Sequence, residues 1–230
     1  MKRCGAVSDI SAVCRALDRG YGPLPPRKCE TPVNVLIATI LSQNTSDVNS
    51  QRAYRSLRRL FPKWADVAGA ALREIEAAIH SGGLARIKAA RIRRVLRLIL
   101  KSEGQLNLAR LKTMRSADAM AWLTGLPGVG VKTAGCVLLF GFGRPVMPVD
   151  THVYRIAGRL GWIRTKTRIE KAPAILERLI PARRILTMHL HLIAHGRRVC
   201  RPHRPRCGAC ALARHCAFDL QKMISTPSPK

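Results

Sequence analysis

The chain has 230 residues, which is long enough to bury a substantial core, so a wholly disordered protein is not expected. Its 41 Lys and Arg outnumber 13 Asp and Glu, and the formal net charge of +28 favours a polyanionic partner, with nucleic acid as the first candidate. The longest nearly apolar stretch, Ala134–Phe142, is too short to span a bilayer, so we expect no membrane segment.

The start of the chain is basic but has no uninterrupted apolar segment before Asp9, so it lacks the core of a secretory signal. We therefore expect the protein to stay in a reducing compartment. There the eight Cys are expected to be metal ligands or buried thiols rather than disulfide partners.

Apolar residues recur at helical spacing along most of the chain. The pattern predicts three successive helices across residues 33–79, and further helices over residues 84–99, 153–160, 169–179 and 185–193. The apolar residues that define the first four helices are Val33, Leu36, Ile37, Ile40 and Leu41; Val48, Tyr54, Leu57 and Leu60; Val67, Ala71, Leu72, Ile75 and Ile79; and Leu84, Ile87, Val95, Leu98 and Ile99.

Strand-like alternation is nearly absent, and Pro and Gly fall between the periodic segments. We therefore expect an all-α protein of roughly ten helices joined by short turns. The last residues, Ser225–Lys230, are predicted to form a disordered tail.

Two runs of basic residues lie within the predicted helices. They are Arg52, Arg55, Arg58 and Arg59, and then Lys88, Arg91, Arg93, Arg94 and Arg97. A solvated helix face is the usual explanation for such a run taken alone. The charge imbalance of the whole chain favours contact with DNA.

Residues 116–140 predict a short helix, a turn at Leu126–Gly130, and a second helix from about Val131. Gly128 and Gly130 have no Cβ, so the backbone N–H groups of the turn can approach a phosphate closely, next to the positive end of the following helix. Such a hairpin grips a nucleic-acid backbone without reading sequence. The alternative is an ordinary turn between helices.

Lys132 falls in the first turn of that second helix, where the helix dipole and neighbouring cations disfavour its protonated form. A neutral amine can attack C1′ of a deoxynucleotide and form a Schiff base, which leads to strand cleavage by elimination. A lysine that only contacts phosphate is the alternative, and the segment alone leaves both open.

Asp150 precedes another helical pattern and is positioned as its N-cap. A fixed carboxylate there can also stabilise the positive charge that develops on a sugar as its base departs. His152 is predicted to contact a phosphate or to cap the helix, and we favour a structural role.

Four thiols lie within 17 residues in the pattern Cys200-x6-Cys207-x2-Cys210-x5-Cys216, which indicates a metal site. Structural zinc sites usually show two Cys-x-x-Cys pairs, and only one is present, whereas a [4Fe–4S] cluster accepts irregular spacing. The loop between the first two ligands carries Arg201, Arg204 and Arg206, which suit phosphate contact. A structural clip with a solvated loop is the alternative.

Together these motifs resemble the endonuclease III family of helix-hairpin-helix DNA glycosylases. The family pattern Leu-Pro-Gly-Val-Gly-x-Lys-Thr-Ala matches residues 126–134, Val-Asp-Thr-His matches residues 149–152, and the 6-2-5 cysteine spacing matches its iron–sulfur motif. The resemblance implies that Lys132 is the catalytic nucleophile, that Asp150 assists it, and that the four Cys hold a [4Fe–4S] cluster.

By this resemblance, residues 31–143 form a six-helix barrel with the hairpin. Residues 1–30 and 144–217 form the cluster domain, residues 218–230 form a tail, and the active site lies in a cleft between the two domains. The implied activity is base excision repair by a glycosylase and abasic-site lyase that removes oxidised or ring-saturated pyrimidines, such as thymine glycol. We expect a monomer that acts on damaged or abasic duplex DNA in a prokaryotic cytoplasm, at the nucleoid.

Excision requires the target nucleotide to leave the stack, and protein groups must then fill the gap. Gln43 and Asn44 are candidates, although Asn44 stands where the family commonly has Gln. Leu84 matches an apolar wedge, followed by Ala85 and Arg86 in place of the common Tyr-Asn; a core residue at a helix start is the alternative. The full set of predicted DNA contacts is Gln43, Asn44, Leu84, Gly128, Gly130, Val131, His152, Arg201, Arg204 and Arg206.

Two other functions remain open from the sequence. One is a mismatch or uracil glycosylase with little lyase activity, against which Lys132 argues because such relatives often lack that lysine. The other is a noncatalytic iron–sulfur protein that uses the hairpin only to bind DNA.

Overall fold

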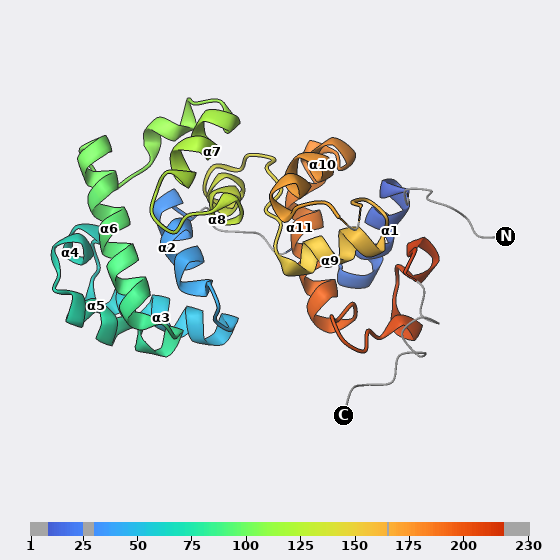
Figure 1. Ribbon diagram of the computed structural model, residues 1–230, viewed down its shortest axis with the longest axis horizontal. Coiled ribbons are helices and arrows are strands. Elements are labelled where there is room, and N and C mark those ends of the chain that lie inside the picture. Colours follow the sequence, from blue (N-terminus) through green and yellow to red (C-terminus); the bar gives the residue numbers. More distant parts are fainter. Residues whose placement is uncertain (1–8, 25–29, 165, 219–230) are drawn as a thin grey trace. The chain divides into compact units, whose positions relative to one another are not determined.

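The computed structural model describes residues 9–24, 30–164 and 166–218 (Figure 1). Cys4, Cys29 and the tail predicted at Ser225–Lys230 lie outside the described residues. Within the described residues the chain forms helices and no strand, so the predicted all-α class is confirmed. The chain divides into two compact units. We call residues 28–148 the central unit, and residues 1–27 with 149–230 the terminal unit.

The central unit is built from seven α-helices and three shorter helical turns. The α-helices are α2 (Pro32–Ser42), α3 (Asp47–Leu60), α4 (Trp64–Gly69), α5 (Leu72–Ile79), α6 (Ala85–Glu103), α7 (Ser116–Thr124) and α8 (Val131–Cys136). The shorter turns are η1 (His80–Gly82), η2 (Ala109–Lys112) and the π-helical η3 (Val137–Gly141). Local caps explain two of the starts: Thr31 Oγ1 accepts from Asn34 N, and Ser46 Oγ accepts from Asn49 N.

The third predicted helix is wrong as a single element, because α4 and α5 break at Ala70 and Ala71. Two contacts from α6 hold the carbonyls at the end of α4: Arg97 Nε donates to Ala68 O (2.8 Å), and Arg93 Nη1 donates to Ala70 O (3.3 Å). The Glu74 carboxylate accepts from Ala71 N at 2.8 Å and starts α5. Caps from a distant helix therefore override a continuous apolar pattern.

The predicted apolar face of α6 is partly wrong. Leu84, Ile87 and Leu98 are exposed, and so are Val48 and Leu60 of the α3 pattern. The buried face of α6 consists of Lys88, Ala89, Ile92, Val95, Leu96 and Ile99. A lysine thus occupies a position in the buried stripe, where an unpartnered charge would be costly.

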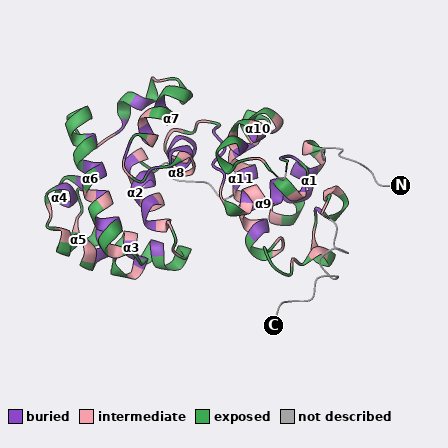
Figure 2. Ribbon diagram, in the orientation of Figure 1, coloured by how far each residue is buried: buried purple, intermediate pink, exposed green. Residues whose placement is uncertain are grey.

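The core of the central unit is assembled around α2, whose Leu36, Ile37 and Ile40 are fully buried (Figure 2). Residues of α3, α6 and α8 pack into the same cluster, including Leu57, Leu96 and Ala134. This core fixes the loops that connect the helices.

The terminal unit contains α1 (Ile10–Tyr21), α9 (Thr151–Arg159), α10 (Ala172–Leu179) and α11 (Ile185–Arg198). The same unit has short 3-10 turns: η4 (Ile169–Lys171) before α10, η5 (Ala182–Arg184) before α11, and η6 (Cys207–Ala209) and η7 (Ala213–His215) after α11. Helix α1 contacts the later helices of this unit: Arg184 forms a bidentate ion pair with Asp18 (2.7 Å to each oxygen), and Tyr21 Oη bonds to His195 Nδ1 at 2.8 Å. Among the described helices, none has the length and apolar character that a bilayer crossing requires.

Candidate functional site

The predicted helix–turn–helix is present in the central unit. α7 ends at Thr124, α8 begins at Val131, and Gly130 is the N-cap residue of α8. Gly128 adopts a φ of 73°, a left-handed conformation that glycine adopts without strain. The turn is closed by Val129 N, which donates to Leu126 O at 3.1 Å.

Gln43 attaches the end of α2 to this turn. Its Nε2 donates to Gly128 O (3.2 Å) and to Thr133 Oγ1 (3.4 Å), and its Oε1 accepts from Arg91 Nη1 at 2.6 Å. The Arg91 side chain lies directly on Gly128, since a Cβ there would fall 2.0 Å from Arg91 Nε. The structure therefore brings Gln43 to the hairpin.

Lys132 lies in the first turn of α8 and is partly exposed. Within the part of the chain that the structure describes, its amine makes no hydrogen bond or ion pair. The amine is therefore available to a ligand, as both the nucleophile and the phosphate-contact alternatives require.

Asn44 and Leu84 share two properties. Both are exposed, and both have a positive φ, at 52° and 50°. Leu84 is 52% exposed, so the alternative that it is a core residue at the start of α6 is wrong. An exposed apolar side chain on a strained backbone suits contact with a partner.

Lys88 and Arg91 belong to a predicted basic run, but they make internal contacts that were not predicted. The burial of Lys88 could have been predicted from its position in the helical repeat, because it shares the buried face of α6 with Ile92, Val95 and Ile99. A lysine at such a position needs internal acceptors.

In the terminal unit, Asp150 caps α9 as predicted. Its Oδ1 accepts from His152 N (2.9 Å) and Val153 N (2.8 Å). The His152 ring contacts Arg155 Nη2 through Nδ1 at 3.1 Å and packs against Gly196, where a Cβ would come within 2.8 Å of it. These contacts suit the structural role that we favoured for His152; contact with phosphate stays a prediction.

The four cysteines Cys200, Cys207, Cys210 and Cys216 line one small cavity, together with Arg159, Pro205 and Phe218. Arg159 Nη1 donates to Cys200 Sγ at 3.1 Å. Burial is the main cause that raises the pKa of the Cys210 and Cys216 thiols, and the neighbouring cysteines raise it further. Free thiolates are thus disfavoured here unless a cation joins them.

Arg201, Arg204 and Arg206 are exposed in the loop that precedes η6. The base of this loop is held by α9: Arg159 Nη1 donates to Arg201 O (2.9 Å), and Arg155 Nη2 donates to Cys200 O (2.8 Å). The loop arginines are therefore presented outward while arginines of α9 secure the backbone.

Comparison with known proteins identifies the family. Residues 37–182 match the HhH-GPD superfamily base excision DNA repair protein family. The endonuclease III of Thermotoga maritima is 37% identical over 187 residues, which cover 81% of this chain and 83% of the relative. That of Escherichia coli K12 is 31% identical over 209 residues, covering 91% and 94%. A solved non-covalent endonuclease III–DNA complex superposes with a TM-score of 0.81 at 28% identity, covering 94% of this chain and 97% of that one. The chain therefore belongs to the endonuclease III family of the HhH-GPD superfamily, and it is a base-excision DNA glycosylase and abasic-site lyase.

Proposed function

We propose that the protein excises oxidised or ring-saturated pyrimidines of the thymine glycol type from duplex DNA and then cleaves the abasic strand by β-elimination. The observation that carries the proposal is the amine of Lys132, which is partly exposed and unbonded beside the glycine turn at Gly128. A turn that can bind the phosphate backbone of DNA, next to an amine without a hydrogen-bond partner, suits attack on deoxyribose.

The reaction divides into two stages. As the C1′–N bond to the base breaks, positive charge develops on the sugar, and the carboxylate of Asp150 stabilises it. Lys132 Nζ, as a neutral amine, bonds to C1′ and loses a proton, and the departing base takes up a proton. The C1′–O4′ bond of this adduct then breaks, O4′ takes up a proton as the sugar ring opens, and C1′ forms a protonated Schiff base with Nζ. The Schiff base acidifies C2′; loss of a C2′ proton breaks the C3′–O bond, and the downstream strand leaves with a 5′-phosphate. Water then hydrolyses the Schiff base and frees the lysine.

The exposed residues supply contact with DNA. We assign the backbone N–H groups at Gly128, Gly130 and Val131 to a phosphate, and Asn44 and Leu84 to the gap that the extruded base leaves. The outward arginines Arg201, Arg204 and Arg206, together with His152, add backbone contacts in the terminal unit.

The four cysteines are proposed to hold a [4Fe–4S] cluster. All four thiols line one cavity. Structural zinc sites usually show two Cys-x-x-Cys pairs, whereas a [4Fe–4S] cluster accepts the irregular spacing found here. When bound, the cluster would anchor the arginine loop as a structural element. Brown protein with broad visible absorbance is expected; colourless protein with stoichiometric zinc contradicts the assignment.

We expect the protein to act as a monomer on nucleoid DNA in a prokaryotic cytoplasm. The bacterial origin of the two relatives named above supports the compartment. Size-exclusion chromatography with light scattering tests the monomer.

Borohydride trapping on abasic DNA tests the nucleophile. Wild-type protein and the control Lys112→Gln, a lysine of η2, are expected to form a covalent adduct, and Lys132→Gln is expected to form none. An adduct that survives Lys132→Gln rejects the assignment.

Excision assays on duplexes with thymine glycol, uracil or a mismatch test the substrate class. Release of thymine glycol followed by strand cleavage is expected. Preferred release of uracil or a mismatched base without cleavage would establish the alternative glycosylase, and binding without base release or nicking would establish a noncatalytic binding protein.

A further inference from the structure

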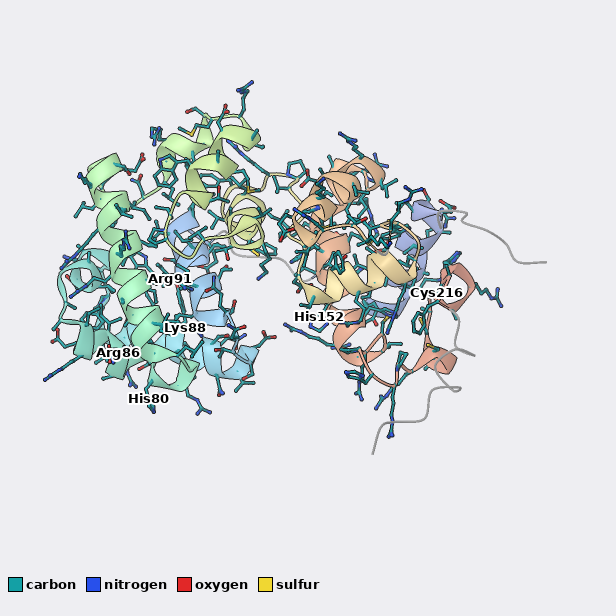
Figure 3. All side chains as sticks on the ribbon, viewed as in Figure 1. His80, Arg86, Lys88, Arg91, His152 and Cys216 are labelled. Carbon is teal, nitrogen blue, oxygen red and sulfur yellow. The ribbon has the colours of Figure 1, made fainter. Side chains whose placement is uncertain are left out.

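Lys88 is buried in the central unit with three hydrogen-bond acceptors around its ammonium. It is 2% exposed, and Figure 3 shows it with Arg91 on the side of α6 that faces α2. Its Nζ donates to Leu41 O (2.7 Å), Thr45 Oγ1 (2.7 Å) and Gly82 O (2.8 Å). An ammonium has three donors, so each is used.

The three acceptors belong to two different segments. Leu41 directly precedes the first segment, residues 42–45, which contains Asn44 and ends at Thr45. Gly82 belongs to the second segment, residues 80–84, which ends at Leu84. The two segments also touch directly, because Thr45 Oγ1 donates to Gly82 O. Lys88 is therefore a cross-link between the two segments that carry the proposed gap-filling side chains.

Both segments hold a strained backbone. Among the non-glycine residues that the structure describes, the positive φ values belong to Asn44, Leu84 and Arg204. A left-handed conformation is unfavourable for a residue with a side chain, less so for Asn, and it persists where the surroundings enforce it. Two of the three strained residues thus lie in the segments that Lys88 joins.

The first segment is also tied to the hairpin through Gln43, which bonds Arg91 and Gly128. Burial, and then the charge of Arg91, lower the pKa of Lys88. The three oxygen acceptors oppose this effect because they stabilise the ammonium.

We propose that Lys88 is a positioning residue for base excision, whose ammonium sets the spacing between Asn44 and Leu84 so that both enter the gap left by the extruded base. This inference rests on the proposed function. Lys88 does not reach DNA itself, since it is buried. Lys88 affects excision indirectly. The contacts of Asn44 and Leu84 offset the free energy of unstacking the target base only when both side chains are already in position.

The test compares two substrates that carry the same thymine glycol. In one the lesion lies in a fully paired duplex; in the other it lies in an unpaired bubble, where no stacked gap must be filled. In single-turnover excision by the iron-loaded protein, Lys88→Met is expected to be at least about tenfold slower than wild type on the duplex, equivalent to about 1.4 kcal/mol. On the bubble we expect a change below about threefold.

The matched control is Lys101→Met, an exposed lysine near the end of the same helix. It should behave as wild type on both substrates. Amide hydrogen exchange in Lys88→Met should rise in residues 42–45 and 80–84 together, with the rest of the central unit unchanged. An equal loss on both substrates, or no loss on either, overturns the proposal.

A second variant covers the case in which Lys88→Met does not fold. Thr45→Val keeps the side-chain shape and removes the hydroxyl that contacts both Lys88 and Gly82, and Thr113→Val is its control in an exposed turn. The same duplex-selective loss is expected, at a smaller size, and its absence overturns the proposal. If wild-type protein excises thymine glycol from neither substrate, the substrate class is wrong instead, and the comparison is repeated with the lesion that the protein does excise.

Discussion

In the central unit, the segments around Asn44, Leu84 and Gly128 are held by side chains of the protein itself. In the cysteine segment of the terminal unit, residues 200–216, arginines of α9 hold the first three residues, Cys200–Pro202. Beyond them, the segment has the longer side-chain contacts of Cys210 Sγ with His195 and of Cys216 Sγ with Arg159 O. Lys88 and Gln43 make five of the hydrogen bonds that fix the first set. The cysteine segment contains only three-residue turns, and Leu212 is its one buried residue.

The two regions differ in the contacts that they need in order to become ordered. The segments that we propose to contact DNA are preorganised by contacts that form as the chain folds. The cysteine segment brings four thiols to one cavity, where burial and the neighbouring cysteines oppose ionisation of Cys210 and Cys216, so we expect its order to depend on the proposed cluster.

The largest expected effect comes from removing that group. Cys210→Ser should abolish the visible absorbance and lower the melting temperature by on the order of 10 °C or more, because a structural metal site contributes several kcal/mol to folding. Calorimetry and absorbance measure the two changes. Cys14→Ala, a buried cysteine of α1 outside the cavity, should keep the absorbance. Equal absorbance in both variants would exclude Cys210 as a ligand.

The second effect separates the two roles of Asp150. Asn retains a capping oxygen, so Asp150→Asn should leave stability nearly unchanged, whereas Asp150→Ala should lose about 1 kcal/mol. Both should slow excision by about 10²–10³-fold, because the charge that stabilises the sugar is gone. Urea unfolding and single-turnover excision measure the pair. The stability control is Asp9→Ala, which removes a similar cap from α1 and should leave excision intact. If Asp150→Asn excises the base at the normal rate, the only remaining role of Asp150 is to cap α9.

A third effect tests the preorganised hairpin. Gly128→Ala places a Cβ on Arg91 in a left-handed backbone, so we expect a loss of about 1–2 kcal/mol in stability and about tenfold in cleavage of abasic DNA. Gly143→Ala carries the same backbone strain, at a φ of 67°, with open space around it. It should match the stability loss and retain activity. If both variants cleave equally well, the Arg91 contact is unimportant.

The smallest effect is a pH dependence in the terminal unit. Burial is the main cause that lowers the pKa of His191, and Arg184 adds to it, while Gly22 O and Asp18 oppose it. Because the folded protein then binds a proton less readily than the unfolded chain, this histidine's contribution to stability is present above about pH 6.5 and is lost as the pH falls through that value. His191→Gln should therefore weaken the fall in unfolding free energy between pH 7.5 and 5.5. The exposed His80→Gln should not, and an unchanged slope in His191→Gln would contradict the assignment.

Local signals predicted much of the structure. The hairpin and the Asp150 cap follow from residues adjacent in sequence, and the structure confirms both placements. The break between α4 and α5 was not predicted, because its caps come from Arg93 and Arg97 on a distant helix. The burial of Lys88 was missed for a related reason: periodicity counts apolar residues and does not identify the partners of a buried charge. For Leu84, the match to an apolar wedge indicated exposure and the periodic pattern indicated burial, and the side chain is exposed.

Several arginines bond the protein's own backbone, which bears on how the affinity for DNA depends on salt concentration. Arg93 and Arg97 bond the backbone at the end of α4, and Arg144 Nη2 donates to Leu111 O and Lys112 O. We expect guanidinium groups that are bonded within the protein to contribute less to counterion release from a duplex than unbonded ones. The slope of log affinity against log salt concentration should therefore report a number of cations well below the one that the formal charge of +28 suggests.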